Sequence, residues 1–118
     1  MKLLIVEDEM IIAMRLEQLV TDLGHEVCAL ASTEDGAIAS AQTHRPDVIL
    51  MDLRLAHGGN GAEAACQIYK TLGIRSIVVS ANIDATAREA LQDCAPIAIV
   101  GKPYQVTELD GALKNYHP

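Results

Sequence analysis

The sequence predicts an α/β fold in which five parallel strands and five helices alternate along a single domain of 118 residues. Two observations lead to this prediction. Short apolar runs recur at nearly regular spacing, and a segment of helical periodicity follows each of them. Four of the five runs are almost continuous in Ile, Val and Leu. Such runs are typical of strands that helices cover on both faces.

Right-handed connections between parallel strands place helices on both faces of a doubly wound, flavodoxin-like sheet. The commonest orders of such a sheet include the order predicted here, 2-1-3-4-5, which leaves a crevice beyond the carboxyl ends of strands one and three. The second run begins with His25 and Glu26 and continues with smaller residues, so we expect it at an edge. The strands are predicted at residues 2–7, 26–31, 47–52, 76–80 and 97–100.

Periodicity and cap residues define the helices. In the first, apolar side chains recur at three- and four-residue steps from Met10 to Val20, and Gly24 stops it. Ser32-Thr33 offers a cap for the second, which ends where Pro46 disfavours a helical conformation in the residue before it. The second to fifth helices are predicted at residues 34–44, 62–72, 84–93 and 105–115.

Composition excludes several classes of protein. Nine basic against 16 acidic side chains give a net charge of −7, which argues against nucleic acid as a direct partner, because phosphate binding depends on Lys and Arg. No apolar run reaches the roughly 18 to 20 residues of a membrane span, so no membrane insertion is expected. The first residues also lack the apolar region of a secretion signal, and we expect a cytoplasmic protein.

The three cysteines, Cys28, Cys66 and Cys94, form neither an even set nor a C-x-x-C pair. Each lies in an apolar stretch of sequence, where a free cysteine packs as a small hydrophobic residue. We therefore expect all three to be free and inert.

Polar side chains follow four of the predicted strands. Glu7 and Asp8 end the first strand and Asp52 the third, so three carboxylates are expected to crowd together in the crevice. Oxygen ligands of this kind suit Mg²⁺, whereas Zn²⁺ favours Cys and His. Ser80 and Lys102, after strands four and five, can both hold a phosphoryl oxygen. The crevice is predicted to be a Mg²⁺ site for phosphoryl transfer, with Asp52 as the nucleophile.

Each of these groups has a structural alternative. The acidic stretch from Glu7 could simply start a helix, and Asp52 could cap a loop. Ser80 could bond the backbone, and Lys102-Pro103 could be an ordinary turn. Their joint placement at one edge of the sheet favours a single functional site.

With the acidic pair, Asp52, Ser80-Ala81 and Lys102-Pro103, the chain resembles a response-regulator receiver domain of two-component signal transduction over essentially its whole length. The resemblance implies a phosphorylated signalling domain rather than an enzyme, which assists its own phosphotransfer and dephosphorylation. It implies that Asp52 accepts phosphoryl from a histidine kinase or histidine phosphotransfer protein. It also implies that Asp8 and Asp52 bind Mg²⁺ directly, with Glu7 acting through water and Arg54 through its backbone carbonyl. Ser80 and Lys102 would contact the attached phosphoryl group, and the Lys102-Pro103 peptide is a candidate for the cis form.

One departure from the family concerns the switch. The family usually has an aromatic residue three positions before the lysine, and here that position is Ile99. A phosphate sink, or an adaptor that binds independently of phosphorylation, therefore stays open as an alternative. A nucleotide-binding protein of the same fold is a further alternative, but no glycine-rich phosphate-binding motif follows any predicted strand. Residues 1–118 are expected to form one receiver domain, with no output domain in this chain and an unidentified protein as its downstream effector.

Overall fold

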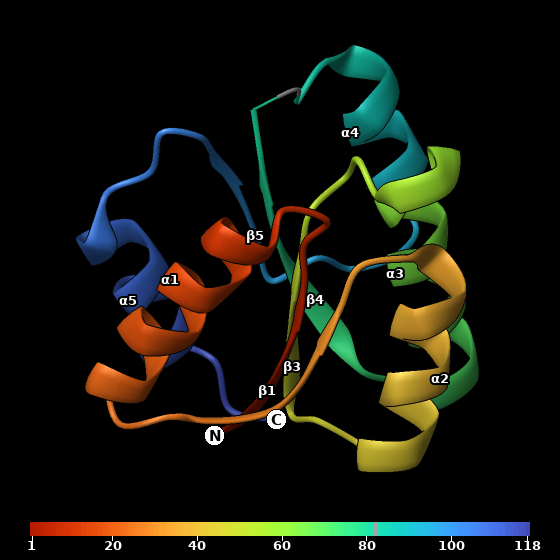
Figure 1. Cartoon of the computed structure of the whole chain (residues 1–118). Helices are drawn as coiled ribbons and strands as arrows, with labels where there is room; N and C mark the ends of the chain where they lie inside the picture. Colours follow the sequence, from red (N-terminus) through yellow and green to blue (C-terminus); the bar gives the residue numbers. More distant parts are fainter. Residues whose placement is uncertain (82) are drawn as a thin grey trace.

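The computed structural model describes residues 1–81 and 83–118, and a parallel sheet of five strands lies at its centre (Figure 1). The order across the sheet is the predicted 2-1-3-4-5, which confirms that the second strand lies at an edge. Every predicted strand is present, and no strand end differs from its prediction by more than one residue. The strands are β1 (Lys2–Val6), β2 (Glu26–Ala31), β3 (Val48–Met51), β4 (Arg75–Ser80) and β5 (Ala98–Gly101).

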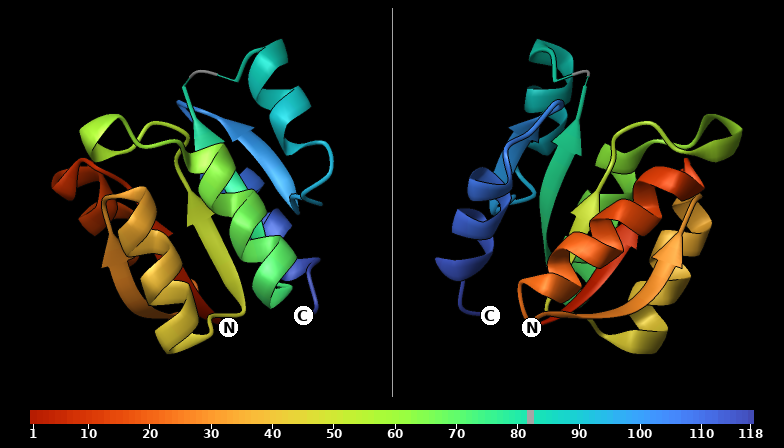
Figure 2. Two further views of the ribbon diagram at one scale, coloured as in Figure 1. Left: turned by 90° about the vertical axis from the view of Figure 1, so that its right-hand side faces the viewer. Right: turned by 60° about the vertical axis from the view of Figure 1, so that its left-hand side comes forward.

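Helices cover both faces of the sheet, as predicted. In Figures 1 and 2, α1 and α5 lie on one face, and α2, α3 and α4 lie on the other. A short 3₁₀ turn, Ala56–Gly58, lies between β3 and α3, and no predicted element corresponds to it. The helices of the described chain are α1 (Met10–Asp22), α2 (Glu34–His44), α3 (Gly61–Leu72), α4 (Ala85–Leu91) and α5 (Val106–Lys114).

The side chains of each central strand divide between two apolar clusters, one on each face of the sheet. On β1, Leu4 and Val6 belong to the cluster under α2, α3 and α4, whereas Leu3 and Ile5 belong to the cluster under α1 and α5. All four are buried. A strand that packs against helices on both sides has no solvent-facing positions, which explains why these runs are continuously apolar.

The helix ends follow from capping. The Thr33 hydroxyl accepts a hydrogen bond from the Gly36 N–H at 2.9 Å, as the sequence predicts for the second helix. Gly24 adopts a positive φ of 94° just after α1, which confirms its role as a stop. Helix α4 ends two residues before its predicted end, because the Gln92 N–H bonds the Glu89 carbonyl and tightens the last turn.

The cysteine prediction is wrong for two of the three residues. Cys66 on α3 and Cys94 after α4 form a disulfide bond, and their Cα atoms are 4.9 Å apart. Only Cys28 is a free, half-buried cysteine. Burial raises the pKa of its thiol, as expected for a cysteine that packs as a small apolar residue. The pairing escapes sequence reasoning because it depends on the packing of α3 beside α4.

Both chain termini lie at the end of the sheet where β1 begins, away from the carboxyl ends of the strands (Figure 1). Among the described residues, no helix has the length and apolar character needed to cross a membrane.

Candidate functional site

A pocket of about 430 Å³ opens at the carboxyl ends of the central strands. Its position agrees with the crevice predicted for this strand order. The residues predicted for the site come from four strand ends, and all of them line this pocket: Glu7, Asp8, Asp52, Arg54, Ser80 and Lys102.

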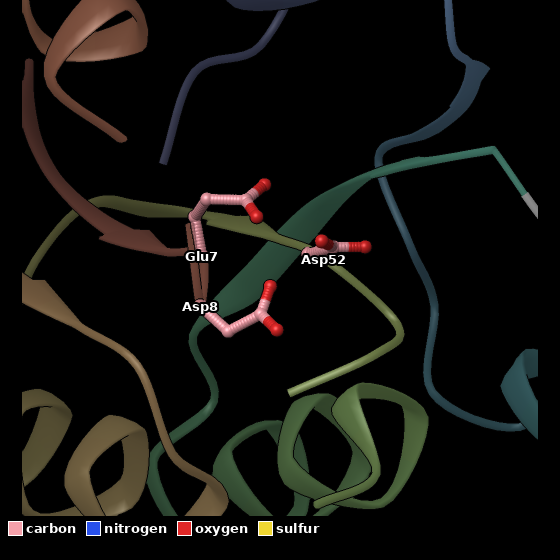
Figure 3. Close-up of side chains that lie close together, drawn as sticks. All are labelled: Glu7, Asp8 and Asp52. Carbon is pink, nitrogen blue, oxygen red and sulfur yellow. The ribbon is translucent and has the colours of Figure 1, made fainter. Parts of the chain in front are cut away.

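Three carboxylates meet in the pocket. Glu7 and Asp8 follow β1, Asp52 follows β3, and Figure 3 shows the three side chains gathered at this edge of the sheet. One oxygen from each lies within 4.8 Å of the others. Glu7 and Asp52 are buried, whereas Asp8 is exposed. This all-oxygen set, with one side open to water, fits the ligand preference of Mg²⁺.

The sheet register brings two of these carboxylates together. Val6 pairs with Met51 at the ends of β1 and β3, so the next residue of each strand, Glu7 or Asp52, emerges at the same level. The Asp52 N–H donates to the Val6 carbonyl at 3.0 Å and extends the pairing by one step. Backbone geometry therefore fixes the spacing of the acidic side chains.

Lys102 bridges the two buried carboxylates. Its Nζ lies 3.0 Å from Glu7 Oε2 and 3.4 Å from Asp52 Oδ2. The sequence predicts Lys102 in the crevice as a group that can hold a phosphoryl oxygen, and the structure shows that it also forms direct ion pairs with the carboxylates. The lysine reaches them because its long side chain extends from the end of β5, which lies beside β4. Its charge offsets part of the repulsion among the carboxylates.

The ion pairs act on both pKa values. Burial, the largest effect, raises the pKa of Glu7 from 4.5 to about 7, although the hydrogen bond from Lys102 opposes this rise. Burial alone would lower the pKa of Lys102, but the hydrogen bond to Glu7 and the charge of Asp52 together raise it. Lys102 is therefore a firm cation at neutral pH, and Glu7 without a bound metal ion is close to half-protonated.

The remaining site residues complete the pocket wall. Ser80 is buried at the end of β4, and its carbonyl accepts the Lys102 N–H at 3.0 Å. The Arg54 N–H donates to Asp52 Oδ1 at 3.4 Å. The Lys102-Pro103 peptide is cis, which confirms the candidate named from the sequence.

Sequence reasoning missed the part played by Gly61, the first residue of α3. A Cβ atom at this position would overlap the carbonyl group of Asp52, and the Gly61 N–H donates to the Leu53 carbonyl at 2.9 Å. The glycine lets α3 start directly against the backbone of Asp52. The Gly-Gly-Asn-Gly run at residues 58–61 is the available signal in the sequence, although its spacing does not show which glycine contacts Asp52.

Ile99 occupies the position where the family usually has an aromatic residue. It lies on β5, pairs with Val78 of β4 and packs against the cluster under α2, α3 and α4. An aliphatic side chain is thus part of the core at this place.

Comparisons with known proteins agree with this geometry. The chain is 34% identical over 113 residues to the phyllosphere-induced regulator PhyR of Methylorubrum extorquens, covering 95% of this chain and 42% of PhyR. It is 30% identical to the chemotaxis protein CheY of Thermotoga maritima, covering 95% of this chain and 93% of CheY. The chain spans about half the length of the first curated relatives that it matches.

Solved structures show the same fold. The response regulator PhyR from Brucella abortus aligns with a TM-score of 0.79 at 34% identity, covering 95% of this chain and 45% of that one. A signal receiver domain of a modulated diguanylate cyclase from Desulfovibrio desulfuricans aligns with a TM-score of 0.88 at 24% identity, over 96% of this chain and 90% of that one. A family model described as "Response regulator receiver domain" matches residues 3–114. The chain therefore belongs to the response regulator receiver domain family, a family of signalling modules.

Proposed function

We propose that this receiver domain accepts a phosphoryl group on Asp52 in a Mg²⁺-dependent step and changes its interaction surface as a result. One observation carries the proposal: the buried carboxylate of Asp52 lies between two further carboxylates and an ammonium group 3.4 Å away. Charges of both signs around one buried nucleophile suit the transfer of an anionic group.

In the proposed step, an Asp52 carboxylate oxygen attacks the phosphorus of a phosphohistidine. The P–O bond forms as the P–N bond breaks, and the leaving imidazole nitrogen keeps the electron pair and takes a proton from solvent. Lys102 offsets negative charge at the acceptor throughout, because its Nζ already lies beside Asp52. Dephosphorylation is a separate hydrolysis, in which water attacks the phosphorus, the P–O bond to Asp52 breaks, and inorganic phosphate leaves as the Asp52 carboxylate is regenerated. The same charged groups would assist this step.

The acidic pocket would hold Mg²⁺ through oxygen atoms. Asp8 and Asp52 would be direct ligands, Glu7 would act through water, and Arg54 would contribute its backbone carbonyl. When bound, the ion neutralises charge on the equatorial oxygens of the transferred group. The support for this assignment is the spacing of the three carboxylates, whose oxygens lie within 4.8 Å of one another.

After transfer, Ser80 and Lys102 are proposed to contact the phosphoryl group. Lys102 would exchange its ion pair with Glu7 for the new anion, and Ser80 would donate its hydroxyl. Because α4 follows Ser80 in the chain, a shift at this strand end passes to that helix and changes the populations of two surface conformations.

The proposed phosphodonor is a sensor histidine kinase or a histidine phosphotransfer protein, and the proposed output is binding to a protein effector, with 1–118 acting as one domain in the cytoplasm. The family supports the first assignment. Relatives named "anti-anti-sigma factor PhyR", from Bartonella quintana, support an effector that is itself a protein.

Incubation with Mg²⁺ and acetyl phosphate, followed by intact mass spectrometry, tests the proposal. The wild-type protein should gain one phosphoryl mass. Asp52→Asn should gain none, and omission of Mg²⁺ should reduce the modification at least tenfold. Asp47→Asn, at the opposite end of β3, is the matched control and should be modified like wild type. An unmodified wild-type protein, or equal modification of Asp52→Asn, would contradict the proposal.

Ile99 favours a second candidate function, a phosphate sink or an adaptor that binds its partner independently of phosphorylation. With an aliphatic core residue at this position, β5 lacks the aromatic side chain that usually follows the hydroxyl group. Hydrogen exchange with and without the phosphoryl mimic beryllofluoride separates the two functions. A switch should change exchange in α4 and β5, whereas a sink or adaptor should show the same protection in both states.

A further inference from the structure

The disulfide between Cys66 and Cys94 has no part in the pocket or in the proposed phosphoryl transfer. It joins α3 to the segment between α4 and β5, across 28 positions of sequence. The Cα separation of 4.9 Å lies well inside the range that a disulfide spans, so the backbone positions themselves suit the bond.

The two sulfur atoms differ in access to solvent. Cys94 is buried, with 5% of its surface exposed, whereas Cys66 is only half-buried. A small thiol can therefore approach the Cys66 sulfur. Exposed disulfides are the ones that exchange most readily, while a buried partner leaves only when its neighbour is attacked.

The surroundings also accommodate the reduced pair. The carbonyl oxygen of Ala90 lies 3.4 Å from the Cys66 sulfur and 3.7 Å from the Cys94 sulfur. Ala90 is in the last turn of α4, where carbonyl groups lack helical N–H partners. A thiol at either position could donate a hydrogen bond to this oxygen. Reduction therefore does not create a buried thiol without a nearby acceptor.

The bond holds a helix that has little other anchorage. In α4, every residue of which the structure describes, Leu91 alone is buried. By contrast, five residues of α3 are buried. Figure 2 shows α4 at the margin of the helical layer, beside the carboxyl ends of the strands. The covalent link to α3, three residues beyond the end of α4, therefore adds an anchor to a sparsely buried helix.

We propose that Cys66 and Cys94 form a reversible redox modification site, which fastens α4 to α3 when oxidised and releases it when reduced. The redox chemistry of the site does not require phosphorylation of Asp52, since neither cysteine lines the pocket. Its redox partners are dithiols in the reducing direction and low-molecular-weight disulfides in the oxidising direction.

Reduction proceeds by thiol–disulfide exchange. A thiolate of the dithiol attacks the Cys66 sulfur, the bond to Cys94 breaks, and the Cys94 sulfur keeps the electron pair and takes a proton. The second thiol of the reductant then displaces Cys66, which is protonated in turn. Two electrons and two protons pass from the dithiol to the protein, and the reductant becomes a disulfide.

A redox titration of the full chain with dithiothreitol and oxidised glutathione tests the site, without any variant. Maleimide labelling and intact mass spectrometry count the reactive thiols, and hydrogen exchange follows residues 84–94. The oxidised protein should be lighter by two hydrogens and expose only Cys28, whereas the reduced protein should label at all three cysteines. Reduction should speed exchange in residues 84–94 about tenfold or more and leave β1 and β3 unchanged, and reoxidation should restore protection.

Two matched variants sharpen the result. Cys28→Ser keeps the pair and should reproduce the whole redox response, while Cys66→Ser should exchange at the reduced rate under both conditions. Three reactive thiols after oxidation, glutathione adducts in place of the internal bond, or equal exchange of residues 84–94 in both states would each overturn the proposal.

Discussion

Two neighbouring helices on one face of the sheet, α3 and α4, differ in how firmly they are held. Helix α3 follows the strand that carries Asp52, buries five residues and starts against the backbone of that aspartate. Helix α4 follows the strand that carries Ser80, and within its described length only Leu91 is buried. The acidic side of the pocket is thus backed by a firmly held part of the fold, β1, β3 and α3, which we call the fixed wall. The chain beyond Ser80 leads into the less buried α4, which we call the loose wall.

The difference suggests a division of labour. The carboxylates belong to the fixed wall, where strand pairing sets their spacing. The Ser80 hydroxyl lies at the end of a buried strand, but the chain beyond it leads into the loose wall, where the sparse burial of α4 allows a second arrangement at low cost in free energy. Substitutions on the fixed wall should lower the stability of the whole domain, and substitutions on the loose wall should open α4 alone.

The largest expected effect comes from cavities in the two helices. Ile68→Ala on α3 should lower the free energy of unfolding by about 3–4 kcal/mol, because Ile68 is fully buried. Leu91→Ala, measured with the disulfide reduced, should cost about 2 kcal/mol or less in global unfolding and mainly speed exchange within α4. Urea denaturation and hydrogen exchange together give both values. Equal global losses would show that α4 unfolds only with the core.

The effect of pH on the free energy of unfolding, through Glu7 in the fixed wall, should be nearly as large. The pKa of Glu7 is about 7 in the folded protein without metal, against 4.5 in the unfolded chain. Folding therefore takes up a proton between these values, so the free energy of unfolding should fall as pH rises from about 4.5 to 7 and then level off, by up to roughly 3 kcal/mol.

Urea unfolding of the metal-free protein across this pH range checks the effect. Glu7→Gln should flatten the profile, and Mg²⁺ should move the transition to lower pH by favouring the carboxylate. A wild-type profile that rises with pH would contradict the burial argument. Because Glu7 belongs to the fixed wall, exchange within α4 should not follow the same curve.

Gly61→Ala tests the contact between α3 and the nucleophile. The added methyl group would overlap the Asp52 carbonyl, so we expect a loss of about 2–3 kcal/mol in global stability and slower modification of Asp52. Gly111→Ala, where a Cβ meets open space in α5, is the matched control and should gain roughly 0.5–1 kcal/mol. Similar effects of the two substitutions in urea denaturation would refute the close approach.

The smallest effect should come from the helix caps. The Asn60 side chain accepts N–H groups of α3 at 2.9 and 3.2 Å, and the Asp84 side chain accepts the Ala87 N–H of α4 at 2.8 Å. Replacement of either by Ala should cost about 1 kcal/mol. Asn60→Ala should show this loss in global unfolding, but Asp84→Ala only in local exchange of α4. A loss of about the same size in the free energy of global unfolding for Asp84→Ala would show that α4 does not open separately from the rest of the domain.

Local patterns were enough to predict the fold and to gather the residues of the pocket. Continuous apolar runs identify strands buried on both faces, and parallel strands place whatever follows them at one edge. For this reason Asp52, Ser80 and Lys102 could be assigned to one pocket from their positions after three different strands. Their chemical roles rest on the resemblance to the family.

Interactions between distant segments were beyond local reasoning. Lys102 pairs with Glu7 across 95 positions of sequence. Whether its side chain reaches the carboxylate depends on where β5 ends. Cys66 and Cys94 look like packing residues in their own stretches, and only the approach of α3 to the α4–β5 segment brings them together. Likewise, nothing in the glycine-rich loop shows which glycine touches the nucleophile until α3 is placed.

The position of the two chain ends has a practical consequence. Both emerge at the end of the sheet where β1 begins, remote from the acidic pocket. A tag, fluorophore or fused protein attached at either end would therefore leave the pocket mouth open (Figure 1).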